Sequence, residues 1–277
     1  MRKLKEAIIK IPILGRTLFI VYRAKTAVGY FRRPLSDLFK WLFKSKEITN
    51  FTYDLEASNI RYLASLIADI ANIEFIVAMA YLKEIEEDGE LREHISGKAA
   101  KSNLSFMADV EVRFGRRIGW YALTRALKPK VIVETGVDKG LGACVLTAAL
   151  KRNKEEGYEG WYYGTDINPK AGYLLFGDYA NFGSILYGDS IESLKKLDGL
   201  IDIFVNDSDH SASYEAKEYK TIENKLSENA IILGDNAHCT DTLLDFSLKT
   251  NRHFIFFQEK PVDHWYPGAG IGISFRR

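Results

Sequence analysis

Short apolar segments alternate with stretches of helical length along the second half of the chain. Five of these segments have the length of strands: 131–136, 161–167, 184–189, 201–207 and 230–235. A polar or amphipathic segment follows each one. Strands that alternate with helices pair in parallel through right-handed crossovers. The pattern therefore predicts an α/β fold built on a doubly wound sheet.

Two further predicted strands, 253–258 and 270–275, end the chain. The loop between them is too short to hold a crossover helix, and strands joined in this way pair antiparallel. We therefore predict a seven-stranded, Rossmann-like sheet that ends in an antiparallel hairpin.

Helical spacing dominates the region before the sheet. Apolar residues from 55 to 87 recur three and four positions apart, which predicts one long helix. The acidic, glycine-containing stretch 84–102 interrupts this spacing and predicts a boundary or a mobile loop, and a further helix is expected over 106–127. Three regions result: an N-terminal arm (1–50), a helical lid or packing region (51–102) and the main domain (103–277).

The overall charge of +1 conceals an asymmetry between the arm and the rest of the chain. Residues 1–50 contain twelve Lys or Arg and three acids, a net charge of +9. The remaining residues contain 26 bases and 34 acids, a net charge of −8. A basic arm on an acidic body indicates an anionic partner for the arm.

The arm is also apolar, notably at 17–22 and 34–43. Its bases interrupt every run that approaches the roughly 18 residues of a membrane span, and no cleavage site of a signal peptide follows. We therefore expect an amphipathic segment on an anionic membrane surface. Packing on another domain or subunit of a homo-oligomer is the alternative, and nucleic acid is not the expected partner.

Two cysteines, Cys144 and Cys239, are too few for a disulfide framework. They indicate a cytoplasmic protein, and with the basic arm they suggest one that is peripheral on the inner face of the membrane.

Acidic side chains lie where the predicted parallel strands end. Ligands bind at the carboxyl ends of such strands. The first strand leads through Glu134 into the glycine-containing loop 136–142, where a tight turn opens a helix. The second ends at Asp166, which can accept hydrogen bonds from both ribose hydroxyls, and the third at Asp189. Each acid alone could instead cap a helix, but their series favours a ligand site.

The order ETGVDKGLG, GTDINP, YGDS, IDIFVNDSDH and ILGDN resembles the successive motifs of class I S-adenosylmethionine-dependent methyltransferases. The resemblance does not extend to the N-terminal helices. It implies contacts of Glu134, Gly136, Gly140 and Gly142 with the methionine part of the cofactor, of Asp166 with the ribose, of Asp189 with the adenine, and of Asp207 beside the cofactor.

The fourth and fifth strand ends carry Asp207 and the pair Asp235-Asn236. Carboxylate and amide oxygens suit Mg²⁺ or another hard divalent cation such as Mn²⁺ or Ca²⁺. The arrangement is similar to that of metal-dependent O-methyltransferases of the catechol and caffeoyl-CoA type. This resemblance implies that Asp207, Asp235 and Asn236 are the metal ligands.

His210 stands three residues after Asp207, where those enzymes have a catalytic lysine. The segment DSDHS is closer to the bacterial sugar and antibiotic O-methyltransferases, which have a histidine there. An imidazole, with an ordinary pKa of about 6.5, can accept a proton near neutral pH. We therefore expect His210 and Asp207 to be catalytic, although His210 and Asp209 could instead cap the following helix.

These residues together predict an enzyme that methylates a hydroxyl oxygen of a sugar, a glycan-like compound or a natural product. Methylation of a small phenol or of nitrogen, and a cofactor-binding module without catalysis, are the alternatives. A nicotinamide dehydrogenase is disfavoured because the GxGxxG fingerprint is missing.

Overall fold

The computed structural model describes residues 12–48, 51–107, 109, 111–235 and 237–276. They form two compact units. One contains the N-terminal helix, up to Lys46, and the short segment Asp263–Tyr266. The other contains the sheet and all further helices, so no boundary between compact units falls near residue 102.

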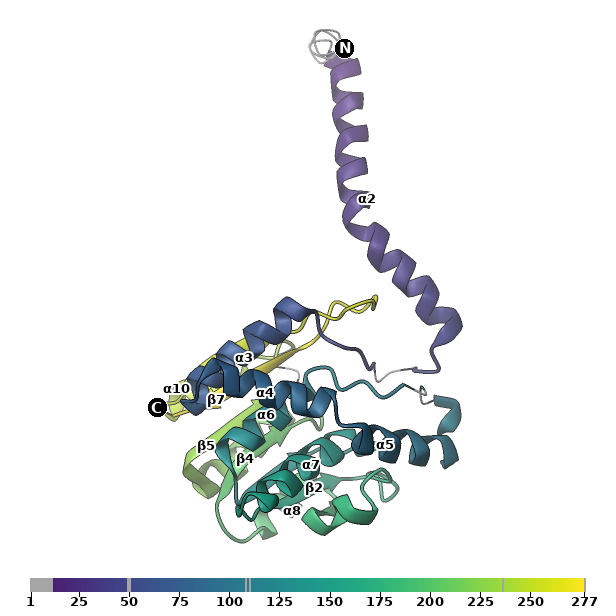
Figure 1. Ribbon diagram of the computed structural model, residues 1–277. Coiled ribbons are helices and arrows are strands. Elements are labelled where there is room, and N and C mark those ends of the chain that lie inside the picture. The colour runs from purple at the N-terminus through teal and green to yellow at the C-terminus, as the bar shows by residue number, and fades with distance from the viewer. Residues whose placement is uncertain (1–11, 49–50, 108, 110, 236, 277) are drawn as a thin grey trace. The chain divides into compact units, whose positions relative to one another are not determined.

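Seven strands of the second unit form one sheet in the order β3-β2-β1-β4-β5-β7-β6 (Figure 1). Strands β1 to β5 are parallel, and β7 runs antiparallel to both β5 and β6. The predicted doubly wound sheet with its antiparallel hairpin is confirmed. Its strands are β1 (Val131–Thr135), β2 (Trp161–Asp166), β3 (Gly183–Tyr187), β4 (Ile201–Asn206), β5 (Leu226–Gly234), β6 (His253–Gln258) and β7 (Gly270–Phe275).

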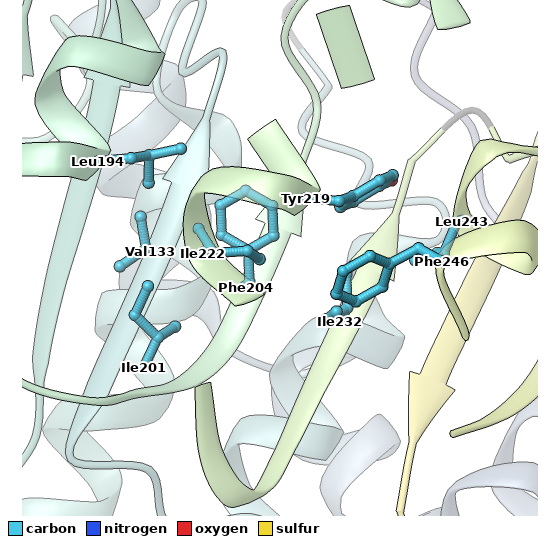
Figure 2. Close-up of a cluster of buried hydrophobic side chains, with 9 residues drawn as sticks. All are labelled: Val133, Leu194, Ile201, Phe204, Tyr219, Ile222, Ile232, Leu243 and Phe246. Carbon is cyan, nitrogen blue, oxygen red and sulfur yellow. The ribbon is translucent and has the colours of Figure 1, made fainter. Parts of the chain in front are cut away.

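Helices cover both faces of the sheet. On one face, α8 (Ser190–Lys196), α9 (Ala212–Ile222) and α10 (Thr242–Lys249) pack on the strands through the buried cluster drawn in Figure 2. Val133 of β1 belongs to this cluster. Successive side chains of a strand point to opposite faces, so the next residue, Glu134, points to the other face, toward Trp120 of α6 (Arg117–Leu127) and Gly142 of α7 (Leu141–Glu155).

The helices before the sheet differ from the sequence prediction. The single helix expected over 55–87 is wrong: α3 (Ala57–Ala71) ends at Asn72, whose left-handed backbone (φ +50°) breaks the helix, and α4 (Phe75–Glu86) begins a new one. The loop expected over 84–102 is also wrong, because α5 (Gly89–Lys101) occupies most of it. The side chain of Asp88 caps α5 by accepting a hydrogen bond from the Leu91 amide at 2.9 Å.

Irregular and 3₁₀ segments complete the second unit. The helix expected over 106–127 is shorter, since α6 begins only at Arg117 and an isolated 3₁₀ turn, η1 (Ser105–Met107), precedes it. Two further 3₁₀ turns are η2 (Gly177–Phe182) and η3 (Glu223–Lys225). Helices α3 and α4 pack on α6, which joins the N-terminal helices to the sheet.

The first unit is dominated by α2 (Pro12–Lys44). Asp37 is buried and pairs with Lys40 at 2.8 Å, and Arg33 pairs with Asp263 at 3.2 Å. Trp41 contacts Trp265 edge to face, with ring centroids 5.3 Å apart. None of the described helices is both long and apolar enough to cross a membrane.

Candidate functional site

The carboxyl ends of β1, β4 and β5 are held in register by backbone hydrogen bonds beyond the strands. The amide of Asp207 donates to the carbonyl of Thr135, and the amide of Asp235 donates to the carbonyl of Asn206, each at 2.9 Å. A Cβ on Gly136 would collide with the carbonyl oxygen of Asp207. Only glycine permits this approach, so the predicted site residues at these three strand ends are brought together.

Glu218 of α9 connects the same strand ends through hydrogen bonds. Its buried carboxylate accepts hydrogen bonds from the Ser208 hydroxyl at 2.9 Å and from Thr135 at 3.4 Å, and closer ones from Ser190 and Asn206. Burial raises the pKa of Glu218, while the hydrogen bonds from Ser190, Ser208 and Asn206 oppose this rise. The loop that carries Asp207 is therefore anchored to β1, α8 and α9 together.

The loop between β1 and α7 turns through three residues with positive φ: Gly136 (+83°), Asp138 (+46°) and Gly140 (+99°). Asp166, at the end of β2, lies beside it. One oxygen of Asp166 accepts a hydrogen bond from the Asp138 amide at 2.9 Å, and the other accepts one from the Asn168 amide at 2.8 Å. Each carboxylate oxygen has a second lone pair, so Asp166 retains the capacity to bind hydroxyl groups.

Glu134 and Gly142 lie together in the interior. Glu134 is 1% exposed and accepts a hydrogen bond from the Tyr162 hydroxyl. Burial raises the pKa of Glu134 to about 7, against the effect of that hydrogen bond. A Cβ on Gly142 would strike the Glu134 carboxylate and the Trp120 ring. The close packing of α7 on β1 thus explains why residue 142 is a glycine. The predicted contact of Gly142 with the cofactor stays a prediction.

Asp189 caps the following helix. Its carboxylate accepts hydrogen bonds from the Glu192 amide and the Tyr214 hydroxyl, both at 3.0 Å. The Glu192 amide is the main cause that lowers the pKa of Asp189. Asp189 is also exposed. Its predicted contact with the adenine is separate from this cap and stays a prediction.

His210 lies beside Asp207 in the loop between β4 and α9. Its Nε2 is 4.0 Å from Oδ1 of Asp207, and its side chain is 41% exposed. The N-cap residue of α9 is Ser211, and the Asp209 carboxylate accepts a hydrogen bond from the Ser211 amide at 2.8 Å within the loop before the helix. The backbone contact of Ser211 lowers the pKa of Asp209. His210 is thus held near Asp207 with its imidazole accessible.

Two arginines that the sequence analysis missed lie at the same strand ends. The guanidinium of Arg116 contacts both carboxylate oxygens of Asp235, and its Nη1 is 3.7 Å from Glu259. Nη2 of Arg117 is 3.8 Å from Asp207. The only signal in the sequence is a pair of adjacent bases at the start of an amphipathic helix. Nothing in the sequence connects this pair to the distant strand ends at Asp207 and Asp235.

Glu259 is also far from Arg116 in the sequence, and two hydrogen bonds hold its carboxylate. It follows β6, is 1% exposed, and accepts hydrogen bonds from the Tyr53 hydroxyl and from the Ala269 amide, the latter at 3.2 Å. Burial and the Glu259 carboxylate both raise the pKa of Tyr53. The carboxylate facing Arg116 is therefore positioned before any ligand binds.

Burial and mutual proximity shift the ionisation of this group. Burial and the neighbouring Asp235 carboxylate raise the pKa of Asp207 well above its usual range, although Arg116 and Arg117 act in the opposite direction. Burial also opposes ionisation of Asp235, but Arg116 outweighs it and lowers the pKa of Asp235. The arginines are thus the charges that balance the two aspartates.

The predicted magnesium site does not fit these contacts. Asn236, one of its three ligands, lies outside the described residues. Among the residues that the structure describes, no group of three or more His, Cys, Asp and Glu side chains could hold a metal ion. Both oxygens of Asp235 already face Arg116, so a cation bound there would have to displace the guanidinium.

Comparison with known proteins supports the assignment of the domain. A family model described as a methyltransferase domain matches residues 133–237, which run from β1 past the end of β5. None of the curated proteins matches the chain.

Solved structures are similar to this chain at low sequence identity. The O-methyltransferase TomG from Streptomyces achromogenes, involved in tomaymycin synthesis and solved with S-adenosylmethionine, is 14% identical over 66% of this chain and 89% of its own, with a TM-score of 0.51. Methyltransferase PaMTH1 from Podospora anserina, solved with S-adenosylhomocysteine, is 20% identical over 68% and 88%, with a TM-score of 0.49. An O-methyltransferase from Bacillus cereus, also with S-adenosylhomocysteine, is 14% identical over 69% and 92%, with a TM-score of 0.49.

The order of the strands, the glycine loop at the carboxyl end of β1 and the family match on 133–237 agree with one another. Residues 133–237 therefore belong to a methyltransferase domain, and the sheet around them has the class I methyltransferase fold.

Proposed function

We propose that the chain transfers a methyl group from S-adenosylmethionine to a hydroxyl oxygen of a small molecule or saccharide. The observation that carries the proposal is the placement of His210 beside Asp207, at 4.0 Å, at the same end of the sheet as the glycine loop. A base next to the cofactor loop is what the methylation of a hydroxyl needs, because an alcohol is a weak nucleophile until its proton leaves.

The cofactor, when bound, supplies an electrophilic methyl group on a sulfonium. The loop 136–140 and the exposed Asp189 lie at the strand ends where its methionine and adenine parts would bind. The Asp166 carboxylate accepts hydrogen bonds from the ribose hydroxyls through its remaining lone pairs. Glu134, a buried residue of β1, lies against Gly142 at the start of α7.

His210 takes the proton of the acceptor hydroxyl on its imidazole. The oxygen forms the new bond to the methyl carbon as the bond from carbon to sulfur breaks, and the products are a methyl ether and S-adenosylhomocysteine. Asp207, whose Oδ1 is 4.0 Å from Nε2, positions the imidazole, and the proton then passes from His210 to water. Holding the two reactants at one strand end supplies orientation, which is a large part of the rate enhancement in such reactions.

The acceptor is best framed as a hydroxyl compound of a sugar or natural-product type. A phenol would react by the same steps, since its hydroxyl also loses a proton. Methylation of nitrogen is the second candidate activity. An amine must lose a proton before its nitrogen can attack, and the same base could remove that proton. A screen with labelled S-adenosylmethionine against alcohols, phenols and amines would distinguish these acceptors.

Cofactor binding is the first test, because it needs no acceptor. The Asp166→Ala variant should bind S-adenosylhomocysteine about 10- to 100-fold more weakly in calorimetry, the loss expected for hydrogen bonds to a charged group.

Asp202 offers a matched control. Its carboxylate also accepts two backbone amides, from Lys130 at 2.8 Å and Val131 at 3.0 Å, but at the amino end of the sheet. Asp202→Ala should lower stability without changing affinity. Unchanged binding in Asp166→Ala would remove Asp166 from the cofactor site, and no binding by the native protein would remove the proposed function.

We also propose that α2 binds an anionic membrane surface. It carries seven Lys or Arg residues and one acid, Asp37, which is already paired. Its apolar side chains are largely exposed, including Phe31 at 63% and Phe43 at 85%. Exposed phenylalanines among bases match the composition of helices that lie in the headgroup region.

A further inference from the structure

A buried arginine already occupies the position between the carboxylates that follow β5 and β6. Arg116 faces both oxygens of Asp235 and lies 3.7 Å from Glu259. Its side chain is 12% exposed, and those of Asp235 and Glu259 are at most 1% exposed. A planar guanidinium that contacts a carboxylate through two nitrogens is a strong and directional pair.

The chain builds this position from several elements. Arg116 immediately precedes α6, and Asp235 follows β5, whose end is tied to β4 by the bond between the Asp235 amide and the Asn206 carbonyl. Glu259 is held by Tyr53 and by the Ala269 amide. The fold thus fixes the backbone of Asp235 and, independently of Arg116, the carboxylate of Glu259.

The charges decide which cation fits. Arg116 and Arg117 already bring two positive charges to the carboxyl groups of Asp207, Asp235 and Glu259. A hard divalent cation prefers six or more oxygen ligands. Here it would lose the oxygens of Asp235 to Arg116 and would lie next to two guanidinium groups in a poorly solvated site, where charge repulsion is strong.

We propose that Arg116 takes the place of a divalent cation, so that methyl transfer by this domain is independent of metal. The part about methyl transfer rests on the proposed function, whereas the exclusion of metal does not. The substrate class follows from it. Without a metal that binds two adjacent oxygens, the acceptor needs no vicinal diol, and compounds with a single hydroxyl are substrates.

The test measures Mn²⁺ binding by the full chain, using electron paramagnetic resonance of the free ion. Native protein should show no saturable site up to about 1 mM Mn²⁺, the weak limit of protein sites for hard cations. It should bind S-adenosylhomocysteine equally well in EDTA. The Arg116→Met variant, which frees Asp235 and Glu259, should acquire a Mn²⁺ site at least about tenfold tighter than any binding by native protein.

Arg125 provides the matched control. It lies on α6, the helix that Arg116 precedes, is buried, and pairs with Glu84 at 2.7 Å and with Glu156. Arg125→Met should lose stability as Arg116→Met does, but should gain no Mn²⁺ site. Circular dichroism checks that both variants fold.

Two results would overturn the proposal. One is a saturable Mn²⁺ site of micromolar affinity in the native protein that Asp235→Ala abolishes; this measurement needs no arginine variant. The other is a folded Arg116→Met variant that gains no Mn²⁺ binding, since Arg116 would then not be what excludes the cation. Absence of S-adenosylhomocysteine binding would contradict the proposed function and leave the Mn²⁺ results unaffected.

Discussion

At the scale of single residues, carboxylates in similar positions perform different tasks because their partners differ. Asp189 and Asp209 each accept a backbone amide at the start of a helix. Asp166 accepts hydrogen bonds from two amides, in the loops that follow β1 and β2. Asp235 faces a guanidinium instead. An acid at the end of a strand therefore does not identify its own role, which depends on what the fold brings against it.

His210 tests the chemistry of the proposed function most directly. With an acceptor from the screen, His210→Ala should reduce turnover about 10²- to 10⁴-fold, the usual effect of losing a general base. Affinity for S-adenosylhomocysteine should stay the same, since the loss falls on the chemical step. His253→Ala, an exposed histidine on β6, is the control. A His210→Ala variant with normal turnover would show that the proton leaves by another route.

Glu134 should give the stability of the protein a specific dependence on pH. Burial raises its pKa to about 7 in the folded protein, whereas the unfolded chain releases this proton near the ordinary value of about 4.3. The folded state thus binds more protons between these values, so the free energy of unfolding should fall as the pH rises from about 4.3 to 7, by on the order of 3 kcal/mol. Above pH 7 this contribution should level off.

Denaturant titrations at several pH values would measure this effect. Glu134→Gln, which cannot ionise, should lack that part of the decline, while Glu228→Gln at an exposed site on β5 should retain it. Identical pH profiles for native protein and Glu134→Gln would mean that Glu134 ionises normally in the fold.

At the scale of elements, the sequence predicted the seven strands well because each is a short apolar run between polar segments. The helices were predicted less well. The apolar spacing continues across Asn72, so the left-handed turn that separates α3 from α4 leaves no gap in the pattern. The arginine pair was missed for another reason: periodicity reports local structure, and the contacts of Arg116 with Asp235 and Glu259 join distant segments.

Gly136 shows how closely two of these elements approach. Its φ is +83°, and a Cβ there would meet the carbonyl of Asp207. Gly136→Ala should therefore displace the loops after β1 and β4 together. It should lower the free energy of unfolding by more than the roughly 1 kcal/mol cost of the backbone conformation alone, and so lower the melting temperature. It should also weaken binding of S-adenosylhomocysteine by more than about tenfold.

Gly199 separates these two causes. Its φ of +88° is similar, but a Cβ there would have nothing within 4 Å, and it precedes β4 at the opposite end of the strand. Gly199→Ala should lose about 1 kcal/mol of stability and retain full affinity. Equal behaviour of the two variants would show that backbone strain, and not the contact with Asp207, explains Gly136.

At the scale of the whole molecule, positive charge is concentrated in a segment outside the methyltransferase domain. Residues 1–50 carry a net charge of +9, and the remainder carries −8. The catalytic proposal uses none of these bases. A helix of 33 residues with exposed apolar side chains therefore calls for a partner of its own, and the excess of bases favours an anionic one.

The membrane proposal is tested by replacing the exposed rings of α2 with acids. Phe31, Phe39 and Phe43 are 63%, 60% and 85% exposed. Native protein should sediment with vesicles that contain phosphatidylglycerol and not with pure phosphatidylcholine, and high salt should weaken the binding. Because burial of one phenylalanine contributes about 1.5 to 3 kcal/mol, changing all three to Asp should reduce vesicle binding by at least about 100-fold.

The control places aspartates on two exposed apolar residues of the second unit, Ile167 and Leu248, which are 79% and 69% exposed. Changing both to Asp should leave vesicle binding intact, because neither belongs to the basic helix. Light scattering addresses the alternative that α2 packs against a second copy of the chain. Native protein that ignores anionic vesicles but forms a dimer, with the triple α2 variant monomeric, would assign the exposed phenylalanines to a subunit interface and would refute the membrane proposal.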